Sequence, residues 1–174
     1  MKIIAGKYKN KKLISFSKNT KPTASMVLEA VFNMLYTIDG IVLDLFAGSG
    51  QYGFEALSRG ASFVYFNDVD KEAYRSLLVN KSNLKLKNEL KITQLDYLEA
   101  LKYYRKKTLF FEIVFLDPPY QFNDEMIAEL LDQVSLVSKT IVLERAKKSS
   151  VITISNKKII KEKNYGKKKI IIYQ

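Results

Sequence analysis

The apolar positions of the chain follow two patterns between residues 41 and 143. Short runs rich in β-branched and aromatic residues predict five strands, at 41–44, 63–66, 90–95, 112–116 and 140–143. Segments with apolar residues three and four positions apart predict helices between them, at 51–59, 71–83, 97–104 and 124–137. Strands that alternate with helices are typical of an α/β fold with a doubly wound, mostly parallel sheet.

The start of the chain has a different pattern. Residues 2–5 and 12–16 predict two short strands joined by a turn-prone segment at 6–10, which together form a basic hairpin. Pro22 is compatible with the start of a helix, and apolar residues at helical spacing predict the first helix at 24–36.

Helical periodicity disappears after residue 150. Apolar segments predict strands there, at 151–154, 159–160 and 169–173, and a turn at 164–167. We therefore expect the sheet to end in antiparallel strands. In this interpretation the chain consists of a basic hairpin at 1–21 and one continuous domain at 22–174.

The residue types that are missing restrict the chemistry. The 174 residues include no Cys and no His, which excludes disulfides, zinc sites, thiol nucleophiles and Ser-His-Asp hydrolysis. Catalysis must rely on carboxylates, the backbone or a cofactor. No apolar run approaches the roughly 20 residues of a membrane helix, so we expect a cytoplasmic protein.

Positive charge is concentrated at the two ends of the chain. Residues 1–21 carry seven Lys and no acid, and residues 156–174 carry seven Lys and one Glu. The formal net charge is +11, so the 134 residues between these ends carry −2. Basic ends on a near-neutral body suggest an anionic partner such as nucleic acid. From charge alone, an equally weighted alternative is that the lysines only keep the surface solvated.

A glycine-rich loop, Asp44-Leu45-Phe46-Ala47-Gly48-Ser49-Gly50, lies between the first strand of the alternating pattern and the following helix. Such a loop lets a ligand approach the backbone and the unpaired N–H groups of the helix. Gly48, Gly50 and Gly53 also satisfy G-x-G-x-x-G, so a nicotinamide dinucleotide is an alternative ligand. The loop alone predicts only a nucleotide-like cofactor.

Acidic residues follow the next two strands. Asp68 and Asp70 come after the second strand, where ribose hydroxyls are held in this class of fold. Asp96 follows the third strand and is a candidate for the adenine amino group of a cofactor. Each of these carboxylates has an alternative role as a helix cap.

The strongest chemical signal is Asp117-Pro118-Pro119-Tyr120, directly after an apolar strand. The two prolines stiffen the turn, which presents the Asp117 carboxylate and the Pro118 carbonyl as acceptors beside an aromatic ring. Acceptors on both N–H bonds of a nucleobase amine favour a pyramidal nitrogen whose lone pair can attack. An electrophilic methyl group, as on the sulfonium of S-adenosylmethionine, needs alignment rather than a strong base.

These motifs resemble the small bacterial RsmD-type methyltransferases, which modify the N2 amine of a guanine in 16S ribosomal RNA. The resemblance covers nearly the whole chain and is carried by residues 3–8, 21–23, 29–33, 44–50, 55–61, 117–120 and 165–167. It implies a Rossmann-like, class I S-adenosylmethionine-dependent methyltransferase sheet with an N-terminal β-hairpin extension.

The resemblance also implies residue roles. The predicted cofactor-binding residues are Asp44, Phe46, Gly48, Gly50, Asp68 and Asp96, with Asp68 holding the ribose where the family usually has Glu. Asp117, Pro118 and Tyr120 would hold the guanine, and the tyrosine ring would stack on the flipped base. No metal is implied.

The implied partner is 16S ribosomal RNA or an assembly intermediate of the small subunit, with no membrane and no obligate protein partner. The candidate RNA-binding residues are Lys7, Lys9, Lys11, Lys12 and Lys21. The family usually has Arg at position 21 and a basic residue at position 28. Lys21 keeps the charge without the bidentate fork of Arg, and Leu28 removes the charge.

Three other functions remain open from the sequence. DNA adenine-N6 methylation uses the same Asp-Pro-Pro-Tyr chemistry, but such enzymes usually carry a target-recognition domain for which 174 residues leave no room. A non-catalytic RNA-binding module would bind no cofactor, and a reductase that uses the glycine loop would bind NAD(P). Titration with S-adenosylhomocysteine and NAD(P) distinguishes these last two from a methyltransferase.

Overall fold

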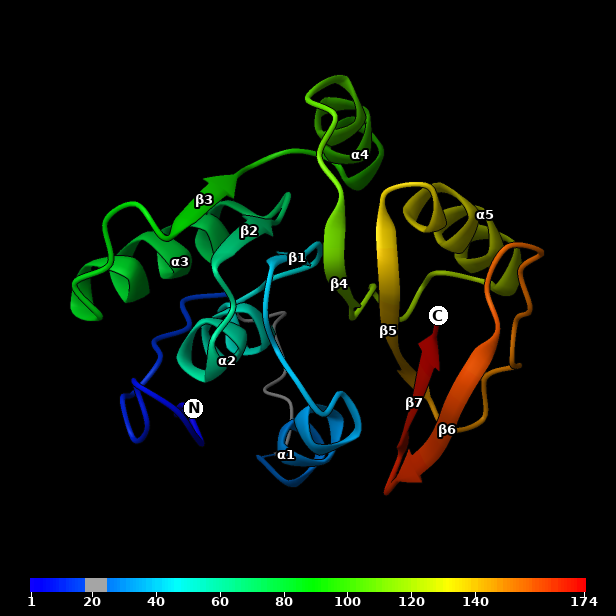
Figure 1. Ribbon diagram of the computed structural model, residues 1–174, viewed down its shortest axis with the longest axis horizontal. Coiled ribbons are helices and arrows are strands. Elements are labelled where there is room, and N and C mark those ends of the chain that lie inside the picture. The colour runs from blue at the N-terminus through cyan, green and yellow to red at the C-terminus, as the bar shows by residue number, and fades with distance from the viewer. Residues whose placement is uncertain (18–24) are drawn as a thin grey trace.

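The computed structural model describes residues 1–17 and 25–174. The described helices are α1 Ser25–Met34, α2 Gln51–Arg59, α3 Lys71–Asn83, α4 Tyr97–Lys106 and α5 Asp124–Ser135. The described strands are β1 Ile41–Asp44, β2 Phe63–Asn67, β3 Leu90–Thr93, β4 Phe111–Leu116, β5 Ser138–Ala146, β6 Ile159–Tyr165 and β7 Lys168–Tyr173. They form one sheet in the order β3-β2-β1-β4-β5-β7-β6 (Figure 1).

The sheet is parallel from β3 to β5 and antiparallel at β7 and β6. The order reverses between β1 and β4, which is the switch point where α/β sheets of this kind bind ligands. This arrangement confirms the predicted Rossmann-like α/β fold.

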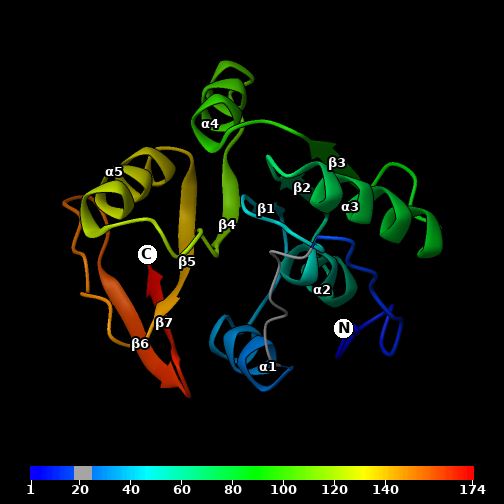
Figure 2. The same cartoon turned by 180° about the vertical axis from the view of Figure 1, so that it is seen from behind.

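Alternating side chains of the strands form two separate cores. Val42 and Phe115 pack on one face with α1, α2 and α3, whereas Leu43 and Leu116 pack on the other face with α4 and α5. Figures 1 and 2 show these helices on the two sides of the sheet. Burial on both faces explains why the central strands are continuous apolar runs instead of alternating with polar residues.

The N-terminal segment, residues 1–17, is paired more sparsely than predicted. Lys2 and Lys12 form a single antiparallel bridge, and Ile3 N–H donates to Lys11 O at 3.0 Å. Two full strands at 2–5 and 12–16 are therefore wrong, but the hairpin-like turn is present. Ile3 and Leu13 are buried in the core cluster beside α2.

Buried polar side chains of α2 hold this segment. Glu55 accepts from Ile4 N–H at 2.7 Å and from Ala5 N–H at 3.1 Å, and it pairs with Arg59 at 2.7 Å. Ser58 Oγ accepts from Tyr8 N–H at 2.9 Å. A buried backbone N–H needs a hydrogen-bond partner. Side chains of α2 provide partners for Ile4, Ala5 and Tyr8, in place of a paired strand.

Most predicted elements are confirmed, with shifted ends. The first helix ends at Met34 because Tyr36 adopts a left-handed backbone with φ 59°. The predicted start of that helix at residue 24, and Pro22, lie outside the described residues. The predicted strand at 151–154 is wrong: only Ile154 makes an isolated bridge, with Lys157, and the apolar side chains pack against the core.

Strand β5 is longer than predicted, extending to Ala146 past the end of its apolar run. Its polar residue Glu144 is buried within the sheet, so hydrophobicity did not reveal it. In the part of the chain that the structure describes, no helix has both the length and the apolar character to cross a membrane.

Candidate active site

The functional candidates lie where neighbouring parallel strands end. Asp44 is the last residue of β1, Asp68 follows β2 and Asp117 follows β4, which lies beside β1. Asp44 is in register with Phe115, so the carboxylates of Asp44 and Asp117 reach the same edge of the sheet. The fold therefore brings together the residues of three separate motifs.

Asp44 ties the glycine loop to the sheet. Its Oδ2 accepts from Gly53 N–H at 2.9 Å in the first turn of α2. Gly53 itself is required by packing, because a Cβ there would lie 2.2 Å from the Phe66 ring. The third glycine of the apparent dinucleotide motif is thus explained by helix–sheet contact.

Burial raises the pKa of Asp44 to about 7, with a further contribution from the nearby Asp68 charge, and the Gly53 hydrogen bond only partly offsets this effect. A carboxylate with a raised pKa at the switch point favours a ligand that brings positive charge, since a cation nearby restores the ionised form.

Asp68 links the second strand to the glycine loop. It accepts from Gly48 N–H at 2.7 Å and from Asp70 N–H at 2.9 Å, and burial raises its pKa. Asp70 caps α3 by accepting from Glu72 N–H at 2.7 Å and Ala73 N–H at 2.9 Å. Of the two acids, Asp70 is therefore the helix cap and Asp68 the loop carboxylate.

Asn67 was not predicted from the sequence, although it is buried between these loops. Its side-chain amide donates to Leu95 O at 3.0 Å, and its Oδ1 accepts from Thr93 Oγ1 at 2.9 Å. Asp96 lies next to this bond and caps α4 through Leu98 N–H at 2.9 Å. The capping role of Asp96 is confirmed, and its contact with a cofactor stays a prediction.

Three aromatic rings connect the glycine loop to the segment after the Asp-Pro-Pro-Tyr turn. The Phe46 ring lies 5.7 Å from Tyr97 and 5.8 Å from Phe122, and Tyr97 and Phe122 are 5.4 Å apart, all between centroids. These contacts pack the glycine loop, the start of α4 and the segment after the turn against one another.

The Asp-Pro-Pro-Tyr turn is anchored at its far end. Phe122 N–H donates to Pro119 O at 3.0 Å, and the mostly buried Arg145 side chain pairs with Asp124 at 2.8 Å. Tyr120, the last residue of the turn, is 70% exposed. An exposed ring on a fixed turn presents a face on which a planar base can stack.

Asp117 is partly buried, which raises its pKa to about 7; Glu144 and Asp44 add to the increase, and Lys168 opposes it. The carboxylate is therefore close to its titration point at neutral pH. A group in this range can both accept a hydrogen bond and take up a proton.

Glu144, Lys168 and Tyr52 form a part of the site that sequence reasoning missed. The Tyr52 hydroxyl donates to Glu144 Oε2 at 2.7 Å, and Lys168 Nζ pairs with Glu144 Oε1. Burial opposes the charge on Lys168, but Glu144 outweighs it, so the pKa of Lys168 is raised. The only sequence signal was an acidic residue that follows an apolar run in a predicted strand.

A small cavity of about 40 Å³ lies between this group and the turn. Its lining includes Asp117, Pro118, Tyr120, Glu144 and Lys168. Acceptors, a cation and an exposed aromatic ring thus share one space at the edge of the sheet.

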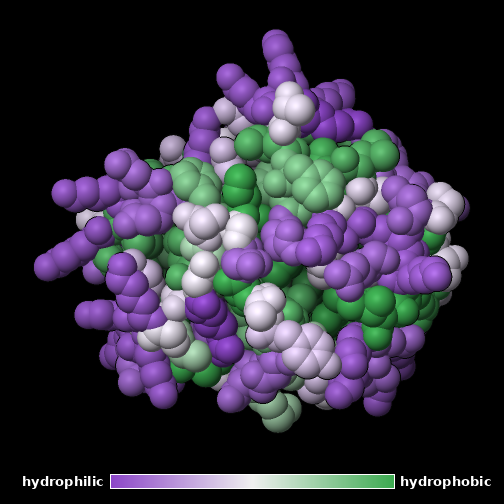
Figure 3. All heavy atoms as spheres, in the orientation of Figure 1, coloured by the Kyte–Doolittle hydropathy of each residue, from purple (hydrophilic) through white to green (hydrophobic). Residues whose placement is uncertain are grey.

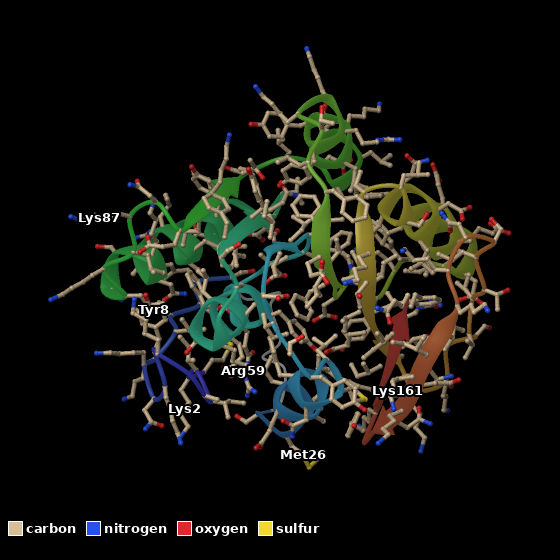
Figure 4. All side chains as sticks on the ribbon, viewed as in Figure 1. Lys2, Tyr8, Met26, Arg59, Lys87 and Lys161 are labelled. Carbon is tan, nitrogen blue, oxygen red and sulfur yellow. The ribbon has the colours of Figure 1, made fainter. Side chains whose placement is uncertain are left out.

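Lys7, Lys9, Lys11 and Lys12 are exposed on the N-terminal segment. Figure 3 shows hydrophilic side chains projecting over this segment, α3 and α4, and Figure 4 shows Lys2 pointing outward beside Tyr8. Lys21 lies outside the described residues. Leu28 is fully buried in α1, so its position offers no contact to RNA.

A second hollow of about 350 Å³ lies between α1 and β6. Its lining includes Asn33, Tyr36, Lys161, Lys163 and Tyr165. Figure 4 shows Lys161 beside α1, far from Lys2 and Lys87. Basic and aromatic side chains are thus present on the C-terminal hairpin as well as on the N-terminal segment.

Comparisons with known proteins show the family of the chain and chains with a similar fold. Residues 1–174 match the family described as Conserved hypothetical protein 95. The chain is 36% identical to Ribosomal RNA small subunit methyltransferase D of Haemophilus influenzae, covering all of this chain and 93% of that protein. It is 32% identical to the Bacillus subtilis protein named Putative rRNA methyltransferase YlbH, over all of this chain and 98% of that one. The solved structure of the putative methyltransferase yhhF from Escherichia coli superposes with a TM-score of 0.85 at 26% identity, covering 100% and 97% of the two chains.

Proposed function

The chain belongs to the family described as Conserved hypothetical protein 95, and we propose that, like the relatives named for ribosomal RNA methylation, it is a methyltransferase. It would transfer a methyl group from S-adenosylmethionine to the N2 amine of a guanine in 16S ribosomal RNA. The observation that carries this proposal is the convergence of Asp44, Asp68 and the Asp-Pro-Pro-Tyr turn at one switch point. The carboxylates proposed to bind the cofactor then lie next to the turn proposed to bind the amine.

The carboxylates at the glycine loop fit S-adenosylmethionine, whose ribose hydroxyls and ammonium group donate hydrogen bonds. Asp68 would hold the ribose hydroxyls, in place of its present bond to Gly48 N–H. The raised pKa of Asp44 fits a ligand that brings a positively charged group, such as the α-ammonium of S-adenosylmethionine, and the partly buried Phe46 ring offers an apolar wall. When bound, the cofactor supplies a methyl group on a sulfonium.

The turn would position the guanine. Asp117 and the Pro118 carbonyl accept the two N–H bonds of the amine, and Tyr120 stacks on the base. Asp117 would take the proton that the nitrogen releases when the methyl carbon passes from sulfur to nitrogen, the S–C bond breaking as the N–C bond forms. A carboxyl with a pKa of about 7 is suited to this role. Alignment of the nitrogen supplies most of the remaining rate enhancement.

The basic N-terminal segment would contact phosphates of the RNA. Lys7, Lys9, Lys11 and Lys12 are exposed and lie on a segment fixed to α2 by Glu55 and Ser58. Phosphate contacts position an RNA without reading its sequence, so base specificity must come from the cavity.

Methyl transfer from labelled cofactor tests the proposal. We expect label in ribosomal RNA of small subunits from a strain that lacks this protein, and mass spectrometry should locate it at the N2 position of one guanine. Duplex DNA serves as the parallel substrate. Label in DNA only, or in an RNA base other than guanine, would contradict the proposal.

A further inference from the structure

Glu144 lies in the wall of the cavity that also holds the amine-binding turn. Its side chain is only 3% exposed, and it shares the cavity with Asp117 and Tyr120. Its position in β5, beside β4, brings it next to the turn from the neighbouring strand.

Two neighbours hold Glu144 while leaving it able to accept further hydrogen bonds. Tyr52 donates to Oε2 at 2.7 Å and Lys168 donates to Oε1, which together fix the plane of the carboxylate. Each carboxylate oxygen has two lone-pair sites, so these two bonds use half of the total capacity. The remaining capacity is available to a donor in the cavity.

Guanine and adenine differ at the ring nitrogen next to the amine. Guanine carries an N1–H donor beside its N2 amine, whereas adenine has an N1 lone pair beside its N6 amine. A wall made of two acceptors, Asp117 and Glu144, matches two adjacent donors and repels an adjacent lone pair. The cavity is thus complementary to the guanine edge.

We propose that Glu144 determines base specificity by accepting a hydrogen bond from the N1–H of the target guanine, and that Tyr52 and Lys168 position Glu144 for this contact. This inference rests on the proposed function. Asp117 then holds the amine and Glu144 reads the adjacent donor. The same arrangement disfavours adenine, whose unprotonated N1 would face the Glu144 carboxylate.

The test uses synthetic RNA substrates with guanine or 2-aminopurine at the methylated position. Both bases keep the 2-amino group, but 2-aminopurine has an acceptor at N1 and no oxygen at C6. We expect the wild-type protein to prefer guanine by about ten- to a hundredfold in kcat/KM. In Glu144→Gln, an amide N–H can donate to N1 of 2-aminopurine, so we expect this ratio to fall at least about tenfold.

Two matched variants separate base reading from support of the fold. Lys168→Met and Tyr52→Phe loosen Glu144 but keep its carboxylate, so we expect lower kcat/KM for guanine while guanine stays preferred. The absence of the C6 oxygen in 2-aminopurine affects every variant equally. The ratio of kcat/KM for guanine to that for 2-aminopurine should therefore change only when the residue that contacts N1, Glu144, is replaced. Binding of S-adenosylhomocysteine by each variant confirms that it is folded.

The outcomes distinguish the two proposals. If wild-type protein methylates no guanine, the proposed function fails. If it methylates guanine and Glu144→Gln keeps the wild-type ratio of guanine to 2-aminopurine, the specificity role of Glu144 is wrong and the methyltransferase stands.

Discussion

At the scale of single residues, the site contains carboxyl groups in surroundings that disfavour their charge. Asp44 and Asp117 both have a pKa near 7, mainly because burial removes water from them. A folded protein binds the proton of such a group more tightly than the unfolded chain does. These groups therefore reduce stability at neutral pH, which is typical of ionisable residues at a functional site.

The free energy of unfolding should reveal the cost of Asp44. The pKa of Asp44 rises from 3.8 to about 7 on folding. Its contribution to the free energy of unfolding therefore decreases by about 4 kcal/mol as the pH rises from about 4 to about 7, and it stays constant at higher pH. We expect Asp44→Asn to unfold at higher urea concentration than the wild type at about pH 8, with little difference at about pH 4.5. The exposed Asp132→Asn is the control. An equal effect of Asp44→Asn at both pH values would contradict this assignment.

Turnover should depend on the Asp117 carboxylate while cofactor binding does not. We expect Asp117→Ala to bind S-adenosylhomocysteine with unchanged affinity in calorimetry and to lose about 10²- to 10⁴-fold in methyl transfer. Full activity in this variant would remove Asp117 from the mechanism.

The pH profile of kcat/KM gives an independent measurement of the same group. We expect activity to rise with pH through about 7 and then to level off, because the ionised carboxylate is the acceptor. Lys168→Met removes the cation that opposes protonation of Asp117, so the inflection should move to higher pH. An inflection that stays in place in Lys168→Met would show that another group titrates.

At the scale of elements, the N-terminal segment is held by side chains of α2 and α3 and is only sparsely paired with itself. Gly6 is the point of closest approach, since its backbone has φ 79° and a Cβ there would lie 1.8 Å from Ser58 O. Gly166, in the turn between β6 and β7, has φ 58° and no atom within 4 Å of a Cβ. The two glycines share a left-handed backbone and differ in the space around them.

Alanine substitutions at these positions should have different costs. We expect Gly166→Ala to lower the free energy of unfolding by about 1–2 kcal/mol, the cost of the backbone alone. Gly6→Ala should lower it by about 3 kcal/mol or more, and amides of residues 3–8 should exchange faster with solvent. Equal losses in denaturant unfolding for the two variants would show that the Ser58 contact is unimportant.

The elements also show how far sequence reasoning extends. The core strands were predicted because both of their faces are buried, so their composition is apolar throughout. The full length of β5 was missed because Glu144 satisfies its charge through Tyr52 and Lys168, which are distant in sequence. Motifs with local spacing could thus be found, whereas a cluster assembled from α2, β5 and β7 could not.

At the scale of the whole molecule, charge and chemistry are arranged on a single sheet. Exposed lysines cover the N-terminal segment, and the carboxylates gather at the ends of the parallel strands. An RNA that is attracted to the lysines must still present the edge of a base to the cavity that Asp117, Glu144 and Lys168 line. Long-range attraction and local selection are therefore carried out by different residues.

The salt dependence of RNA binding should locate the phosphate contacts. We expect Lys9→Gln with Lys11→Gln to weaken binding of ribosomal RNA and to reduce the slope of log affinity against log salt by about 1–2. Lys106→Gln with Lys107→Gln, at the far end of α4, changes the charge equally and should leave the slope unchanged. The same loss of slope in both double variants would mean that binding follows net charge alone.

The reversed direction of β7 has a consequence for how such a protein can diversify. Because β7 runs against β5, its first residue, Lys168, pairs opposite Ala146, so the turn before β7 lies at the edge of the sheet where Asp117 follows β4. Under the proposed function, changes in that turn would alter target selection without disturbing the half of the sheet that carries the glycine loop proposed to bind the cofactor. The reaction can therefore stay the same while the target changes, because the two depend on different halves of the sheet.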